Sequence, residues 1–217
     1  MIAEQKISLL SFYKGGIPIS SSSASDAQNC VASCHRLERR SAPHKEIQHM
    51  AEDNFTITTF YTSWKAYQDH ITGAIAPLTA EQLEVRIAPH LRSIGENVMH
   101  IVSCRAYWFA AFMSDVEGSE MKVYAGWNED ALKLGAPVPT VANLARGLDH
   151  SWQFMAECLA RWSPDDMRQT FPDEWDGKQV DLSRAWVVWH VMEHDLHHGG
   201  ELSLTLGLHG LPADFPG

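Results

Sequence analysis

The sequence predicts an all-α protein, a four-helix bundle with a long connection between its second and third helices. Two observations predict this fold. Apolar side chains recur every three or four residues over four stretches, and no stretch alternates apolar and polar residues for long enough to build a sheet. A helix of about 20 residues is about 30 Å long, which is the proportion typical of such bundles.

The first two predicted helices span residues 55–75 and 93–113. Residues 55–75 place apolar side chains at helical spacing, among them Ile57, Trp64 and Ile71. The second helix cannot begin much earlier than residue 93, because Pro89 lacks the amide hydrogen that a helix interior requires. The two helices are therefore expected to be separate.

Residues 114–139 are expected to form the long connection. The stretch contains three glycines and two prolines, which interrupt regular helices. The third helix is predicted over 141–162, with Thr140 as its N-cap and Ser163-Pro164 as its end. A polar connection through Asp176-Gly177 then leads to the fourth helix, which is expected over 182–206 and ends at Gly207.

The first fifty residues differ from the rest in composition. Residues 1–50 carry six basic and four acidic side chains, a net charge of +2, whereas 51–217 carry eleven basic and 23 acidic ones, a net charge of −12. The first segment is rich in serine and has no sustained apolar period, so it cannot bury enough surface to offset its ordering entropy. We expect residues 1–52 to be a disordered leader, or an upstream extension of a chain that starts at Met50, and 53–217 to form the bundle domain.

Composition excludes three classes of protein. A net charge of −10 argues against binding nucleic acid through phosphate neutralisation, which needs clustered Lys and Arg. The longest apolar run, residues 106–113, is too short to cross a bilayer. Four cysteines are too few for a disulfide scaffold of this length and suit a reducing compartment, so we expect a cytoplasmic location.

The fourth predicted helix contains the segment WHVMEHDLHHGGELS, in which His190, His194, His197 and His198 lie within nine residues. Side chains four residues apart share a helix face, so either 190 with 194 or 194 with 198 can converge on one ion. One helix cannot surround a metal, and a third ligand must come from elsewhere. His100, in the apolar setting of the second helix, is the candidate.

Other interpretations of these histidines stay open. His100 by itself would more often be a hydrogen-bonded core residue, and the cluster could lie on a solvated face. The sequence lacks HExxH, GxSxG and phosphate-binding loop motifs, and its helices lack the paired Glu-x-x-His of di-iron bundles. What remains is a mononuclear site rich in imidazole, which suits one divalent transition metal such as Zn, Ni or Fe.

Three segments resemble the DinB family, also called the DinB/YfiT-like metalloenzymes. They are APLTAEQLEVRIAPHLRSIGENVMHIV, DGKQVDLSRAW and HVMEHDLHHGGELS, and the resemblance covers roughly residues 53–212. It implies that His100, His194 and His198 bind one metal inside the bundle, and it favours the 194/198 pair. The usual last motif continues His-Arg-Gly-Gln; here Gly199 replaces the arginine, which removes a positive group near the site.

Further polar residues are expected to line the pocket or to hydrogen-bond the ligands. Glu201 is expected to support a ligand or to be one itself, and Glu96 and Asn97 would orient His100. His150 either points into the bundle or shares a polar face with Asp149. The full set of these candidates is Glu96, Asn97, His150, His190, His197 and Glu201.

Three neutral imidazoles leave a bound ion with its full charge and an open position, which favours an anionic hydroxide or thiolate. The resemblance implies the thiolate, because some relatives are similar to bacillithiol- or mycothiol-dependent S-transferases. We therefore expect a metal-dependent thiol S-transferase of the stress or detoxification type, acting on a low-molecular-weight thiol and a small-molecule electrophile. The long connection, with Tyr124 and Trp127, would close over the substrate.

Two other functions stay open. One is a non-catalytic metal-binding bundle in a stress or damage response, and the other is a metal-dependent hydrolase, so the sequence leaves undecided whether the protein is an enzyme. Many bundles of this kind pair, and we also consider a homodimer.

Overall fold

The computed structural model describes residues 61–113, 121–213 and 215. All of them lie in the second of the two units into which the chain divides, Asn54–Gly217. The leader expected over residues 1–52 lies outside the described residues and stays a prediction.

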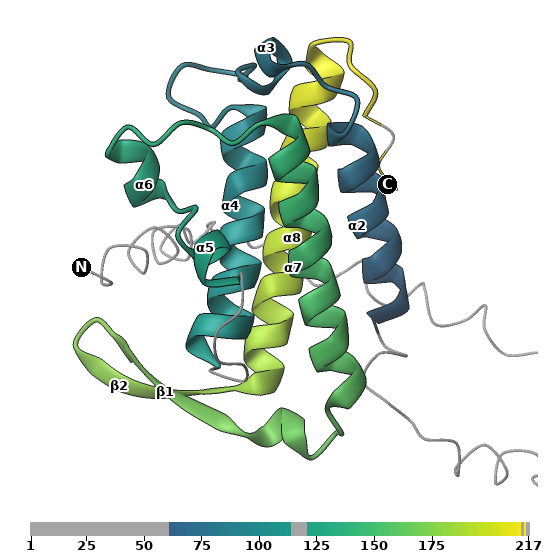
Figure 1. The fold of residues 1–217 in the computed structure, drawn as a ribbon. Coiled ribbons are helices and arrows are strands. Elements are labelled where there is room, and N and C mark those ends of the chain that lie inside the picture. The colour runs from purple at the N-terminus through teal and green to yellow at the C-terminus, as the bar shows by residue number, and fades with distance from the viewer. Residues whose placement is uncertain (1–60, 114–120, 214, 216–217) are drawn as a thin grey trace, which may run out of the picture. The chain divides into compact units, whose positions relative to one another are not determined.

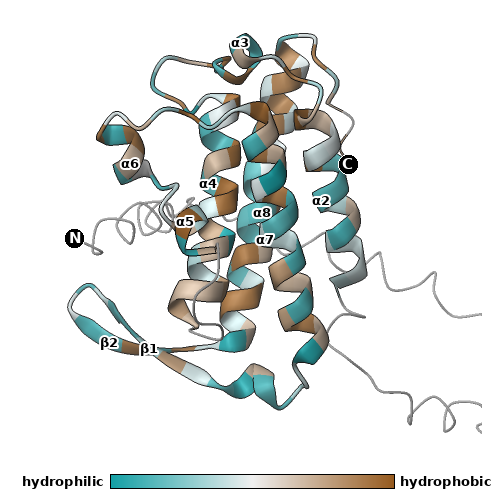
Figure 2. Cartoon of the chain, in the orientation of Figure 1, coloured by the Kyte–Doolittle hydropathy of each residue, from teal (hydrophilic) through white to brown (hydrophobic). Residues whose placement is uncertain are grey.

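The described residues form a bundle of four long helices (Figure 1). These are α2 (Thr62–Ile75), α4 (Ile94–Ala106), α7 (Val141–Arg161) and α8 (Arg184–Leu208). In Figure 2 they carry both apolar and polar residues along their length, as amphipathic helices do. The predicted all-α bundle is confirmed. Within the described part of the chain, no helix combines the length and apolar character that crossing a bilayer requires.

Side-chain caps define where three of the four helices begin. The Ser93 hydroxyl accepts a hydrogen bond from the amide of Glu96, and the Glu96 carboxylate accepts one from the amide of Ser93. Thr140 and Ser183 cap α7 and α8 through one such bond each. Each cap satisfies an amide that has no partner within the helix, which explains why serine and threonine mark these starts.

The second predicted helix is continuous but changes from an α-helix to a π-helix along its length. The α-helical part α4 ends at Ala106 and continues as the π-helix η4 (Tyr107–Phe112). The expected connection that follows is partly helical, because it contains the short helices α5 (Met121–Ala125) and α6 (Glu129–Lys133). A further short helix, α3 (Ala80–Leu83), precedes α4.

A β-hairpin joins α7 to α8, and the expectation of no sheet was wrong here. After the short 3₁₀ helix η5 (Asp166–Arg168), β1 (Thr170–Trp175) pairs antiparallel with β2 (Lys178–Ser183). The turn places Asp176 at φ 50° and Gly177 at φ 74°. Asp-Gly is a favoured pair for a two-residue hairpin turn in which both residues have positive φ. This dipeptide was the available signal, but the alternation around it is short.

Two apolar clusters fill the two ends of the bundle. One contains Ile71, Val98, Leu144 and Leu202, and the other lies nearer the hairpin, with Phe109, Met155, Val187 and Leu182 among its members.

Four buried polar side chains on α2, α4 and α8 form what we call the ion-pair network: Trp64, Gln68, Arg105 and Asp195. Arg105 Nη2 lies 2.8 Å from Asp195 Oδ2, and both side chains are fully buried. Trp64 Nε1 donates to the same carboxylate at 2.7 Å, and Arg105 Nη1 donates to Gln68 Oε1 at 2.6 Å. The network therefore ties three helices together.

Candidate metal centre

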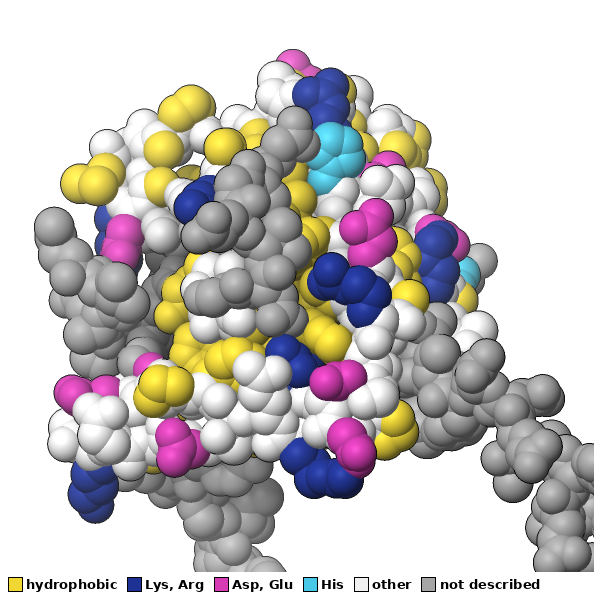
Figure 3. Space-filling view, turned by 60° about the horizontal axis from the view of Figure 1, so that its bottom comes forward, with side chains coloured by type: hydrophobic (Ala, Val, Ile, Leu, Met, Phe, Trp, Pro, Cys, Tyr) yellow, Lys and Arg dark blue, Asp and Glu magenta, His cyan; other side chains and the backbone are white. Residues whose placement is uncertain are grey.

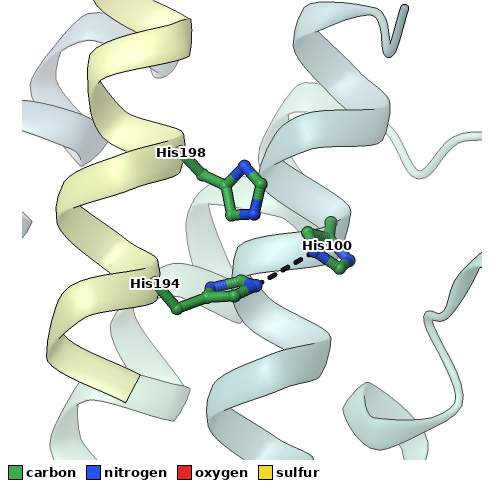
Figure 4. Close-up of side chains that lie close together, drawn as sticks. All are labelled: His100, His194 and His198. Carbon is green, nitrogen blue, oxygen red and sulfur yellow. Dashed lines mark hydrogen bonds between the residues drawn. The ribbon is translucent and has the colours of Figure 1, made fainter. Parts of the chain in front are cut away.

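Three histidines from two helices meet inside the bundle, and we call them the histidine triad: His100, His194 and His198. His194 and His198 lie one turn apart on α8, and His100 lies on α4, which packs against α8. Figure 4 shows the three rings turned toward a common point, with the ring of His198 one helical turn above that of His194 on α8. His194 and His198 are buried and His100 is partly buried.

The spacing of the triad matches the size of a metal site. His100 Nε2 lies 3.0 Å from His194 Nε2, and the candidate ligand atoms of all three residues lie within 4.8 Å of one another. The ring centroids of His194 and His198 are 4.3 Å apart. Two nitrogens bound tetrahedrally to one zinc ion at about 2.1 Å are separated by about 3.4 Å. Small ring movements would therefore bring the three nitrogens to binding distance.

The triad is held in the uncharged form that metal binding needs. Burial, helped by the charges of Arg92 and His198, lowers the pKa of His100 to about 3. Burial and the neighbouring histidines lower the pKa of His194 well below its ordinary value. At neutral pH both rings therefore keep a free lone pair, which is what a metal ligand requires.

Glu201 fixes the orientation of His198. The Nδ1 atom of His198 lies 2.7 Å from Glu201 Oε2, and because a carboxylate only accepts, the hydrogen sits on Nδ1. This tautomer leaves Nε2 of His198 as the acceptor, while the hydrogen bond lowers the pKa of Glu201 to about 2. A carboxylate behind a ligating histidine is the usual supporting arrangement in metal sites. The structure thus places Glu201 beside the triad as a support.

Asn97 supports Glu201 from the neighbouring helix. Its Nδ2 atom donates to Glu201 Oε2 at 3.2 Å and lies 3.4 Å from the backbone oxygen of His198. Asn97 therefore contacts the His198 side of the site, whereas the sequence analysis expected it to orient His100.

A second group, His197, His198 and Glu201, also brings its ligand atoms within 4.8 Å of one another. The His197 side chain is 58% exposed, and its Nε2 lies 3.2 Å from Glu201 Oε1. With the hydrogen of His198 on Nδ1, this group offers one fewer nitrogen, so the buried triad is the better metal site.

Glu96 and His150 do not join the triad in the expected way. The Glu96 carboxylate caps α4 and pairs with Arg86 at 3.2 Å, which occupies the group that would have oriented His100. His150 Nδ1 lies 3.1 Å from the hydroxyl of Tyr124, so this histidine is directed toward α5.

Tyr124 and Trp127, the two rings of the long connection that were expected to close over a substrate, pack against the bundle instead. Tyr124 is buried in the apolar core, and Trp127 packs against α7 so closely that a Cβ at Gly147 would lie 2.9 Å from its ring. Residues 114–120 of the same connection lie outside the described residues. The idea that Tyr124 and Trp127 close over a substrate is therefore wrong for these two side chains.

At the position after His198, the arginine of the family motif would require the Tyr67 side chain to move. A Cβ at Gly199 would lie 2.2 Å from the hydroxyl oxygen of Tyr67. Another arginine supplies positive charge, because Arg92, just before α4, is among the groups that lower the pKa of Glu201 after the dominant hydrogen bond from His198. The site therefore has a nearby cation that the sequence analysis did not identify.

His190 extends the site toward the hairpin. It is buried one turn before His194 on α8, and its ring centroid lies 6.3 Å from that of His194. Burial lowers the pKa of His190 to about 4. His190 therefore lies beside His194, and its ring also contacts Trp108 and Trp186, which the sequence pattern did not predict.

Comparisons with known proteins relate this chain to one family and one solved structure. The sequence profile of the DinB family matches residues 50–214. The chain belongs to the DinB family. A DinB-like protein from Bacillus cereus has a similar structure, with a TM-score of 0.56 and 22% sequence identity over 75% of this chain and 97% of that chain. That similarity shows a shared fold. No curated protein matches the sequence significantly.

Proposed function

We propose that this DinB-family protein is a metal-dependent thiol S-transferase of the stress or detoxification type. The observation that carries the proposal is the convergence of three neutral imidazoles from α4 and α8 on one buried point. A set of three nitrogen donors is the ligand set of open, catalytic zinc sites, and imidazole equally suits nickel and iron. Residues His100, His194 and His198 would hold the ion.

A divalent ion in such a site lowers the pKa of a bound thiol and so supplies a thiolate nucleophile at neutral pH. The chain itself provides the setting. Burial keeps His100 and His194 unprotonated, so their nitrogens are available to the ion, and a ligand set of imidazoles without a carboxylate adds no negative charge that would repel an anionic sulfur. Glu201 holds His198 in the tautomer that presents Nε2, and Arg92 adds positive charge close by.

The proposed reaction joins a low-molecular-weight thiol to a small electrophile. The thiol gives its proton to solvent, the sulfur forms a bond to an electrophilic carbon, and the bond from that carbon to the leaving group breaks. The leaving group departs with the electron pair. A cytoplasmic location belongs to this proposal, because small thiols stay reduced there.

The test is thiol-dependent turnover. Untagged, metal-loaded protein is mixed with bacillithiol, mycothiol or another small thiol and with monochlorobimane, and adduct formation is followed by fluorescence. We expect turnover in the wild type and none in His194→Ala. His209→Ala is the matched control, because His209 is exposed at the end of α8.

The remaining outcomes identify the other functions. Ester hydrolysis that needs metal but no thiol would overturn the transferase and support a metal-dependent hydrolase. Metal that raises the melting temperature with no turnover of any kind would support a non-catalytic bundle.

A further inference from the structure

Six ring side chains surround the hairpin end of the bundle beside the histidine triad. They come from η4, the hairpin and the start of α8, and we call them the aromatic cluster: Trp108, Phe112, Phe171, Trp175, Trp186 and His190. Within it, the rings of Trp186 and His190 are stacked at 4.9 Å and 11°, and Trp108 meets His190 edge-on at 5.1 Å.

The π-helix helps to build this cluster. In η4, Trp108 and Phe112 lie on the same side, with ring centroids 4.8 Å apart, and Trp108 reaches Trp186 at 5.7 Å. π-helical turns occur mostly as local insertions and are frequent at functional sites. The irregular turn therefore brings two large rings to the start of α8, next to the triad.

The rings of the cluster remain partly accessible. The five tryptophan and phenylalanine rings of the cluster are half-buried, whereas side chains of the nearby core, such as Phe109 and Val188, are fully buried. Figure 3, which brings the hairpin end forward, shows hydrophobic side chains gathered in the middle of the visible face. Half-buried aromatic rings of this kind offer faces and edges to a planar ligand.

One polar atom in this apolar setting has no hydrogen-bond partner among the residues that the structure describes. His190 is only 7% exposed, and within the described part of the chain its buried Nε2 atom makes no hydrogen bond. A buried polar atom without a partner is unfavourable and rare in native proteins, and such atoms are often explained by a ligand or a functional role. His190 also connects the cluster to the triad, because its ring centroid is 6.3 Å from that of His194.

We propose that the aromatic cluster binds a planar aromatic electrophile, with His190 Nε2 hydrogen-bonded to a polar atom on the edge of the substrate ring. The proposal rests on the proposed function and names its substrate class. Trp108 and Trp186 contact the faces and edges of the substrate ring, and the reacting carbon lies toward the triad. In the transfer, the thiol proton goes to solvent, the sulfur–carbon bond forms, and a halide leaves with the bonding electrons.

The first test measures binding without reaction. Tetramethylbimane, a planar ligand with two carbonyl oxygens and no leaving group, is titrated into wild type and variants by calorimetry. Trp186→Leu removes the stacked ring and is expected to weaken binding about tenfold or more. His190→Phe keeps a ring but removes the nitrogen, and a severalfold loss is expected. Trp189→Leu is the matched control, because Trp189 is 54% exposed on the same helix, and its affinity should equal that of wild type.

The second test measures turnover with two electrophiles. Trp186→Leu should raise the KM for monochlorobimane while leaving the KM for iodoacetamide, which has no ring, unchanged. Circular dichroism and metal content verify that each variant is folded. If Trp186→Leu does not fold, His190→Phe and Trp175→Leu are compared in the same two assays.

The outcomes separate this inference from the proposed function. Absence of turnover together with bimane binding that depends on Trp186 would overturn the transferase and keep the aromatic site. Turnover with equal bimane affinity in wild type, Trp186→Leu and His190→Phe would keep the transferase and overturn the inference. Tighter binding of phenyltrimethylammonium than of tert-butylbenzene would also overturn it, because the rings would then select a cation.

Discussion

The ion-pair network and the histidine triad are both buried and polar, and they meet on α8, where Asp195 directly follows His194. They differ in how their polar atoms are used. Asp195 is charged, pairs with Arg105 at 2.8 Å and accepts from Trp64, so its atoms are occupied by the protein. His194 is uncharged, and its Nε2 lies 3.0 Å from His100 Nε2, beside the ring of His198. The comparison shows one buried group whose polar atoms are paired within the protein and one whose ligand atoms lie close enough together that they could hold a metal ion.

The largest expected effect tests the structural half of this comparison. Arg105→Met removes one partner of a fully buried pair and leaves the Asp195 charge uncompensated, so we expect the free energy of unfolding to fall by about 3–5 kcal/mol. Urea unfolding measures it. The control is Asp69→Ala, which breaks the exposed pair with Lys65 and should change stability by less than about 1 kcal/mol. Equal effects of the two substitutions would break the comparison.

The next effect tests the ligand half. His194→Ala should weaken zinc binding by more than about 100-fold, because even residues that only support ligands contribute about 10–100-fold. Competition with a chelating dye measures the affinity. His209→Ala should bind zinc like the wild type. An unchanged affinity in His194→Ala would remove His194 from the metal site.

The supporting carboxylate should have a smaller effect. Glu201→Gln keeps the size of the side chain but weakens the hydrogen bond that fixes the His198 tautomer, and we expect zinc affinity to fall by about 10-fold. The same chelator competition applies. A loss as large as that of His194→Ala would mean that Glu201 is itself a ligand.

The pH dependence of the metal-free protein sharpens the difference in charge. Burial lowers the pKa of His100 to about 3. Below about pH 6.5, the unfolded chain therefore binds a proton at His100 that the folded protein does not bind. The contribution of neutral His100 to stability is therefore fully present above about pH 6.5 and should be lost progressively as the pH falls toward 3. Urea midpoints from pH 7 to 5 measure the slope, which should be flatter in His100→Ala than in His209→Ala. Equal slopes would contradict a buried neutral His100.

The smallest expected effect is that of deleting residues 1–49. The family profile begins at residue 50, and every described element lies after residue 60. Deletion of residues 1–49 should therefore leave the melting temperature and metal content unchanged when compared with the full chain. Loss of soluble protein after this deletion would show that the bundle depends on residues 1–49.

The helices and the triad could be predicted because their signals are local. Ser93, Thr140 and Ser183 mark helix starts through their own side chains, and the four-residue spacing of His194 and His198 fixes a shared face. The hairpin is nearly as local, since Asp176-Gly177 favours its turn, but its strands are too short to be recognised by alternation alone.

The partners of the site depend on packing between helices that no local pattern contains. Glu96 and Asn97 are equivalent in sequence as polar neighbours of His100, yet one caps its own helix and the other reaches Glu201 across the bundle. Arg105 and Asp195 are 90 residues apart in the sequence, so their pairing can be recognised only from the three-dimensional structure. The available signal was the position of Arg105, a charged residue directly before the apolar run 106–113.

The most direct test of the central claim is elemental analysis of untagged protein purified from cells, with His100→Ala and His194→Ala prepared in parallel. We expect about one divalent transition metal per chain in the wild type and in His209→Ala, and almost none in the two triad variants. Wild-type protein without metal after incubation with zinc, nickel and iron(II), or metal retained at equal stoichiometry in both triad variants, would contradict it.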